Sequence, residues 1–410
     1  MPIAVAPRLC VMMFLNYVIW GAWYVTIGTW LTQTLHFTGT QTGAVFGTAA
    51  LSCMISPFFV GLIADRYFAT ERILCALHLM GAVLLLLVAR STTFASVYLL
   101  LLTYCLCYFP TIALTNSLTL RNIKDAASEF PRIRVFATIG WIVIGVAIGY
   151  LQIEKSATPF LIAAGCSVIM AVFCLTLPHT PPQAKGHPAS WRTIAGFDAL
   201  VMLRNRSFAV FVIASVLACI PLTFYFSFTN AYLNEVGVAN AAGKMTLGQV
   251  SEVVMMLLMP LIYRRFRLKT IFLAGLLAWS VRYVFLAFGN AGDLSILFYA
   301  AILLHGVCYD FFFMTGQLYT DQEAPAHLRG TAQGFLQFLT YGVGMFIGSM
   351  LSGWVVDVFT TTAGTTVTRN WAGFWLTSAA GAFLILLLVA GLFRSRGRVQ
   401  TQEAVAVAGD

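Results

Sequence analysis

Asp310 carries a carboxylate near the middle of residues 302–318, a stretch apolar enough to cross a bilayer. An acid at the centre of a spanning helix costs about 2.5–3.5 kcal/mol on insertion scales, so such acids usually face a cavity or a partner. Tyr309 precedes it, and Phe313 follows at i+3 on the same helix face. We predict that Asp310 binds the coupling proton of a transport cycle. The structural alternative is a salt bridge that joins two helices.

A second set of polar residues lies in the apolar segment 132–153. Arg134, Thr138 and Trp141 are spaced at i, i+4 and i+7 and therefore share one helix face. The long Arg134 side chain starts near the membrane edge, from which it can reach inward, and we predict that it pairs with Asp310. In the alternative, Arg134 extends outward to the inner headgroups.

Segment 245–263 contains another intramembrane acid. Gln249 and Glu252 are one turn apart on one face. An amide and a carboxylate in this arrangement can both bind hydroxyl groups, which suits a hydroxylated ligand. We predict that both bind substrate and that Glu252 is the alternative proton site. Hydrogen bonds between packed helices are the structural alternative for each.

Other intramembrane polar residues are weaker candidates because Ser and Thr often bond their own helix carbonyls and Trp often anchors at membrane interfaces. Those that we expect to line the substrate path are Thr223, Ser227, Asn230, Asn116 and Trp20. His78 and His305 are candidate proton relays, with a packing role as the alternative for each.

The composition is that of an integral membrane protein. Of the 410 residues, 60% are hydrophobic and 10% charged, whereas soluble domains have about 25% charged residues. The net charge of +9 is spread over short loops, so it does not indicate a nucleic-acid site. The nine cysteines show no CxxC spacing, and we interpret them as small buried hydrophobes without disulfides or a metal site.

The pattern predicts an all-α polytopic membrane protein with twelve transmembrane helices. The apolar segments are 9–31, 41–63, 73–90, 95–120, 132–153, 157–177, 207–233, 245–263, 269–288, 293–319, 328–356 and 370–393. They divide into an N-terminal six-helix bundle (1–177), a cytoplasmic linker (178–206), a C-terminal six-helix bundle (207–393) and a cytoplasmic tail (394–410). An amphipathic helix over 190–205, with Leu200 and Leu203 on its apolar side, is predicted to lie on the inner membrane surface.

The positive charges predict the orientation. Nineteen of the 24 Lys and Arg fall on the side of both termini and the linker; the exceptions are Arg90, Lys155, Lys244, Arg369 and the intrahelical Arg282. Since basic loops stay in the cytoplasm, both termini are predicted to be cytoplasmic.

The turn after the second segment contains Gly61, Asp65 and Arg66. It resembles the Gly-x-x-x-Asp-Arg signature of the major facilitator superfamily, in which a six-plus-six layout with a central loop is also typical. We assign these three residues to an inner gating motif. An ordinary tight cytoplasmic turn is the alternative.

Several motifs resemble the bacterial nucleoside:H⁺ symporter family of that superfamily. They are Phe109–Ser117, Phe130–Trp141, Gln249–Glu252, Tyr309–Phe312 and Ala332–Gly334. The resemblance implies proton-coupled nucleoside import through a central cavity lined by Arg134, Thr138, Trp141, Gln249, Glu252, Tyr309 and Asp310. It also implies a multi-pass protein of the bacterial inner membrane. We expect a monomer that works with a small-molecule solute and protons in the lipid bilayer, and that needs no cofactor beyond the coupling proton.

The sequence departs from this family in the seventh apolar segment, residues 207–233. Nucleoside-transporting members have amide side chains where this chain has Thr223 and Phe226, and Phe313 stands where an amide can occur. A sugar or amino-sugar symporter on the same fold is therefore the alternative. A polytopic membrane enzyme is a remote one, because the chain contains no HExxH, GxSxG or Gly-Lys-Ser loop.

Overall fold

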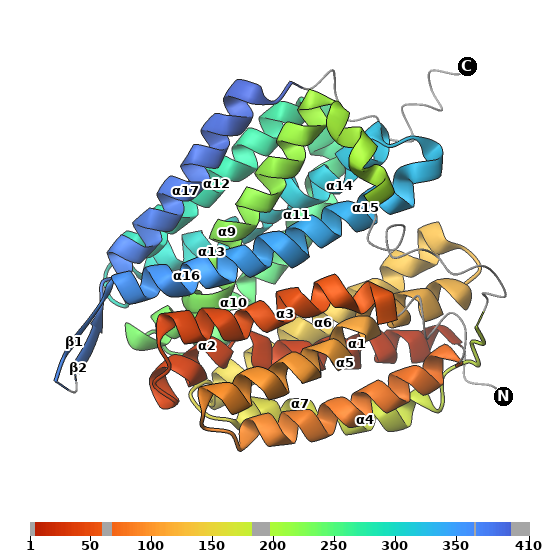
Figure 1. The fold of residues 1–410 in the computed structure, drawn as a ribbon, viewed down its shortest axis with the longest axis horizontal. Coiled ribbons are helices and arrows are strands. Elements are labelled where there is room, and N and C mark those ends of the chain that lie inside the picture. The colour runs from red at the N-terminus through yellow and green to blue at the C-terminus, as the bar shows by residue number, and fades with distance from the viewer. Residues whose placement is uncertain (1–4, 60–67, 183–196, 365, 395–410) are drawn as a thin grey trace.

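The computed structural model describes residues 5–59, 68–182, 197–364 and 366–394. Figure 1 shows two bundles of helices lying side by side, one for each half of the chain. The first comprises α1 (Val5–Tyr24), α2 (Ile27–Thr29), η1 (Trp30–Thr34), α3 (Gly39–Phe59), α4 (Thr70–Ala89), α5 (Phe94–Arg121), α6 (Ala126–Leu151) and α7 (Thr158–Cys174). The short η3 (Phe197–Arg204) precedes the second bundle.

The second bundle begins and ends with a long continuous helix, and several of the helices between these two are divided into shorter segments. It comprises α9 (Arg206–Glu235), α10 (Ala241–Met245), α11 (Leu247–Arg265), α12 (Leu268–Phe288), α13 (Ser295–Tyr309), η4 (Asp310–Met314), α14 (Thr315–Glu323), η5 (Ala326–Leu328), α15 (Arg329–Gln337), η6 (Phe338–Gly344), α16 (Met345–Val358), the strands β1 (Thr360–Ala363) and β2 (Thr366–Arg369), and α17 (Trp371–Leu392).

A helix stands at the place of each predicted apolar segment. When consecutive helical segments are counted together, ten stretches of the described residues are long and apolar enough to cross a membrane. The helix over Thr158–Cys174 is shorter than these, and α3 ends next to residues that the structure does not describe. The all-α, multi-pass character that the sequence predicts is confirmed.

Each half has its own hydrophobic core, and the same helix pairs recur in both. In the first half α1 packs on α6 and α4 on α7; in the second, α9 packs on α16 and α12 on α17. Phe226 of α9 packs against both cores and so lies where the halves meet. The same pairing of helices in both halves is the arrangement of an internal structural repeat.

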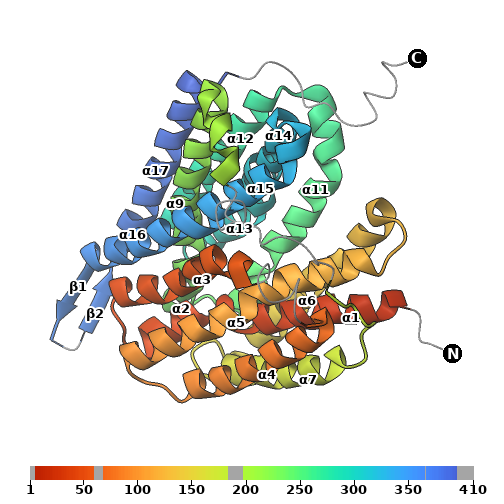
Figure 2. The same cartoon turned by 45° about the vertical axis from the view of Figure 1, so that its right-hand side comes forward.

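Close backbone approaches join the halves at the end of the molecule that carries β1 and β2 (Figure 2). A Cβ at Gly353 of α16 would lie 2.3 Å from the carbonyl oxygen of Gly39 on α3, so only glycine fits there. The contact of α3 with the helix of α16 continues inward as far as Met54 and Gly342. In both views the beginning of α1 and the end of α17 lie away from this end.

Two features differ from the prediction. The strands Thr360–Ala363 and Thr366–Arg369 form an antiparallel hairpin with Thr360 opposite Arg369, because β-branched threonine recurs in both strands and Gly364, with a φ of +63°, suits a tight turn. The described part of the predicted amphipathic helix is the 3₁₀ helix η3, in which Ala199 and Met202 are buried and Leu200 is exposed. Gly61, Asp65 and Arg66 lie outside the described residues.

Candidate functional site

Asp310 is the first residue of η4, a wide π-helical turn inside the helix that runs from Ser295 to Glu323. Asp310 is only 1% exposed, and its Oδ2 has no hydrogen-bond partner among the described residues. Thr315 Oγ1 donates to the Asp310 carbonyl oxygen at 3.0 Å, which supports the widened turn. Such turns occur often at functional sites. A buried acid with an open oxygen fits a group that exchanges a proton or meets a ligand.

Glu252 of α11 is the second acid of the site, and it interacts electrostatically with Asp310. Its Oε2 lies 3.9 Å from His305 Nε2 of α13. The helices α11 and α13 approach closely here because position 306 is glycine: a Cβ there would sit 2.7 Å from the Glu252 backbone nitrogen. The structure therefore brings both predicted acids into one region of the second half.

Arg134 does not pair with Asp310 in this structure. Its Nη2 donates to the Tyr17 hydroxyl at 2.6 Å, and its guanidinium carbon lies 4.5 Å from the centre of the Tyr17 ring. The acid on which the Arg134 charge acts is Glu252. The predicted Arg134–Asp310 pair is therefore wrong for this conformation, because Tyr17 of α1 holds the guanidinium within the first half.

Aromatic rings form a wall beside Arg134. Trp141 and Trp20 meet edge to face, with ring centres 5.1 Å apart, and Trp20 Nε1 is buried without a partner among the described residues. The Tyr24 ring contacts the rings of Trp141 and Phe226, and the ring centre of Phe226 lies 6.0 Å from that of His305. Thr138 is half-buried on α6, in the turn before Trp141. The wall thus runs from the first half to the second.

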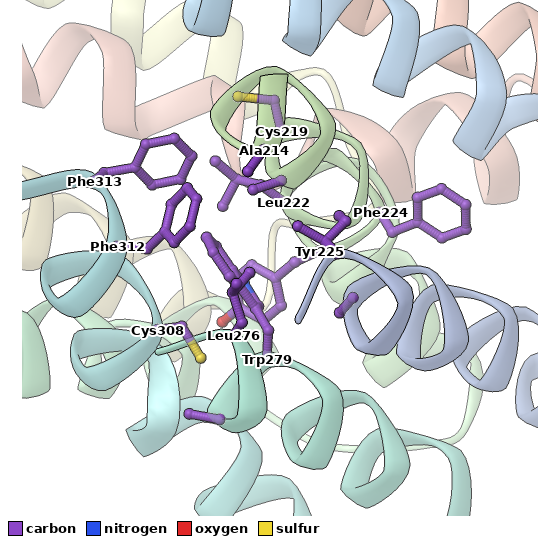
Figure 3. Packing of buried hydrophobic residues seen from close by; sticks show 14 of the residues in the cluster. Ala214, Cys219, Leu222, Phe224, Tyr225, Leu276, Trp279, Cys308, Phe312 and Phe313 are labelled. Carbon is purple, nitrogen blue, oxygen red and sulfur yellow. The ribbon is translucent and has the colours of Figure 1, made fainter. Parts of the chain in front are cut away.

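The predicted residues of the second half lie in different surroundings. Gln249 is half-buried and has no side-chain hydrogen bond to a described residue, so its amide is free for a ligand. The Tyr309 hydroxyl is hydrogen-bonded to that of Tyr341 in η6. Phe313 is 6% exposed and packs edge-on against Trp279, within the cluster that Figure 3 shows. Phe313 is therefore largely part of the core.

The helix 7 and helix 4 candidates are dispersed. The Thr223 hydroxyl donates to the Ile220 carbonyl of its own helix at 2.7 Å, which is the structural alternative stated above. Ser227 is buried, with its hydroxyl unpartnered among the described residues. Asn116 is half-buried on α5, about one and a half turns before the helix ends at Arg121. These residues do not converge on the two acids.

Asn230 takes part in a polar network that joins the halves and that sequence reasoning missed. Glu154, in the loop before α7, is 3% exposed and accepts hydrogen bonds from Asn230 Nδ2 (2.7 Å), Asn234 Nδ2 (2.7 Å) and the Ala242 backbone N–H (3.0 Å). Thr29 of the first half donates to Asn230 Oδ1 at 2.5 Å. We call this network the Glu154 latch. Its only sequence signal was an acid next to an apolar segment.

Three further residues near the site were not predicted: Tyr17, Tyr341 and Arg282. Arg282 is fully buried on α12 and bonds to His305. Its signal was visible, since a charge inside an apolar segment is costly. The two tyrosines were indistinguishable from the many packing aromatics of the chain.

A polar cleft of about 650 Å³ lies away from the two acids, beside β1 and β2. Its lining includes Gln33, His36, Lys155, Glu235 and Arg369. Among the residues that the structure describes, no group of three or more His, Cys, Asp and Glu could hold a metal ion. The chemistry of the candidate site is therefore that of two buried acids, a free amide and an aromatic wall.

Comparisons with known proteins identify the family of the chain. The family model described as "Nucleoside H+ symporter" matches residues 3–398. YegT of Escherichia coli (strain K12), named as a nucleoside transporter, is 40% identical over 98% of this chain and 96% of its own. The xanthosine permease of the same organism is 32% identical over 94% and 95%. A crystal structure of the nucleoside transporter NupG superposes with a TM-score of 0.88 at 27% identity, covering 96% of this chain and all of that one. These relatives are transporters and not enzymes, and the chain belongs to the nucleoside:H⁺ symporter family.

Proposed function

We propose that this protein imports nucleosides together with protons by alternating access between its two halves. The observation that carries the proposal is Asp310: a buried acid of the second half with an open oxygen, close to a second acid. A buried carboxylate without a partner is costly, so its neutral form can move through a dry intermediate more readily than its charged form.

The surroundings of the two acids suit a nucleoside. Gln249 and Glu252 offer an amide and a carboxylate for ribose hydroxyls. The Trp20–Trp141 wall offers faces and edges on which a base can stack, together with the free Trp20 N–H. Tyr309 and Phe313 close the site on the side of the second half, with Phe226 between the two walls.

The conformation is proposed to be closed toward the outside. The Glu154 latch and the Gly39–Gly353 approach join the halves at the end that carries β1 and β2. The positive charges support an orientation in which that end lies on the outer face of a bacterial inner membrane, with both termini and the linker in the cytoplasm. We further propose that the protein acts as a monomer and needs no cofactor beyond the coupling proton.

One observation keeps a sugar-type solute as the second candidate. Thr223 bonds its own helix and Phe226 is apolar, so neither of these two positions of α9 supplies an amide to read a base. A solute recognised only through hydroxyls would need no such group.

Uptake into proteoliposomes under an imposed proton gradient tests the proposal. A labelled nucleoside should accumulate unchanged when the outside is acidic, and accumulation should collapse when an ionophore removes the gradient. Competition by unlabelled nucleosides but not by free sugars would favour the first candidate, and the reverse would favour the second. Accumulation that does not depend on the proton gradient would refute proton coupling.

A further inference from the structure

Arg282 is a cation buried in the middle of α12, and its contacts fix its neighbours. Its residue is fully buried, and its guanidinium carbon lies 3.4 Å from the centre of the Tyr225 ring. Its Nη1 lies 3.0 Å from Nδ1 of His305. Arginine has donors only and does not lose its proton in proteins. His305 Nδ1 must therefore accept this hydrogen bond, which leaves the ring proton on Nε2.

The opposite edge of the same imidazole, which carries Nε2, faces Glu252. His305 Nε2 lies 3.9 Å from Glu252 Oε2, so the N–H that Arg282 imposes is directed at the carboxylate of the substrate region. The ring is stacked on Tyr225 at 5.5 Å and 21°, and it also contacts Phe226 and Tyr309. A Cβ at Gly248 would sit 3.2 Å from the His305 Cβ, so α11 leaves little room for the ring to swing.

We propose that Arg282 is a positioning residue that holds His305 neutral, with its proton on Nε2 facing Glu252. The role in transport rests on the proposed function; the protonation state does not. His305 then holds a fixed N–H near Glu252 instead of acting as a proton relay. Protons are carried by the acids, and this N–H stays on the side of Glu252 in every state in which Arg282 stays bound.

The groups that face His305 agree with this assignment. Arg282 comes from α12, Glu252 from α11 and Tyr225 from α9, and Tyr309 follows one turn on in its own helix. Asp310 begins the next segment, while Lys244 of α10 lies over the Tyr299 ring, 5.8 Å from its centre. A second proton on His305 would need Nδ1, which accepts from Arg282, and would place two cations in contact.

The protonation state can be measured in the unmodified protein. We would label histidine with ¹⁵N, assign His305 by its loss in His305→Gln, and follow both ring nitrogens between about pH 5 and 8, the range in which histidine normally titrates. Nδ1 should stay unprotonated and Nε2 protonated throughout. The buried His78, whose Nε2 has no partner among the described residues, is the internal comparison. A proton on His305 Nδ1, or a second proton within this range, would overturn the proposal.

A variant tests the cause of this protonation state. In Arg282→Met the donor to Nδ1 is gone while the ring stays buried, so the ring proton of His305 is free to move between Nε2 and Nδ1. The ¹⁵N spectrum of this variant should therefore show a proton on Nδ1 in part of the molecules, whereas the wild type carries it on Nε2 alone.

A control makes this result specific: Arg90→Met, which changes an exposed arginine, should keep the wild-type His305 spectrum. A folded Arg282→Met protein with an unchanged His305 spectrum would overturn the proposal. If Arg282→Met does not fold, the wild-type spectrum decides alone. If the wild type transports no nucleoside, the proposed function fails while the spectrum still tests the assignment.

Discussion

Replacing Glu154 by Gln should open the latched end of the molecule. One carboxylate oxygen of Glu154 accepts from both Asn230 and Asn234, and the other accepts from the Ala242 backbone. A Gln side chain has one acceptor oxygen, so its amide group must face at least one of these donors. The closed form then loses at least one hydrogen bond to a charged group, worth about 1.5–3 kcal/mol.

This loss sets the size of the expected shift. In the open form either side chain is hydrated, so about 2 kcal/mol is lost from the closed form alone. At 1.4 kcal/mol for each factor of ten, the open population should rise about 30-fold. Ser227 is a suitable reporter, because it is buried beside Gly28 at this end of the molecule.

The assay measures modification of Ser227→Cys by a membrane-impermeant thiol reagent added from outside. Adding Glu154→Gln should raise this modification rate about 30-fold. The protein that keeps Ser227 gives the background rate of modification. Glu235→Gln is the matched control, since Glu235 at the same end pairs with Arg369 within the second half. If the Glu154 and Glu235 variants give equal rates, the latch does not hold the two halves together.

The remaining predictions concern the latch, the ligand and the topology. Asp357 accepts from the Gly39 and Thr40 backbones across the halves, so Asp357→Ala should raise the same modification rate about fivefold, the effect of losing about 1 kcal/mol of helix capping; no change would remove it from the latch. Gln249→Ala should weaken nucleoside binding by about 1–3 kcal/mol, measured by calorimetry in detergent, and an unchanged affinity would reassign Gln249 to packing. Cysteine placed at the exposed Ala239 should react with impermeant reagents from outside only, and labelling from the cytoplasmic side alone would invert the topology.

The helical architecture was predictable because the spans are strongly apolar and because the bilayer sets their length. Asp310, Gln249 and Glu252 were predicted as site residues because charges and amides are rare in such helices. The hairpin over 360–369 was not predicted, because a short threonine-rich stretch between spans carries no long periodic signal.

Contacts within the site were less predictable than its residues. Pairing Arg134 with Asp310 used opposite charge and depth alone, whereas the structure gives Arg134 a nearer partner in Tyr17. Asn230 was placed with the substrate because it is polar and intramembrane, yet the same features serve the Glu154 latch. Which of two buried partners a polar side chain meets depends on how helices far apart in sequence pack, and a single helix face does not contain that information.

The most direct test of proton coupling is uptake by Asp310→Asn, which mimics the neutral acid and cannot release a proton. In proteoliposomes with an acidic exterior, the wild type should concentrate labelled nucleoside, and so should Asp321→Asn, a change to another acid of the same helix. Asp310→Asn should not concentrate it, yet should still exchange internal for external nucleoside. If Asp310→Asn accumulates nucleoside against its gradient like the wild type, Asp310 is not the coupling acid.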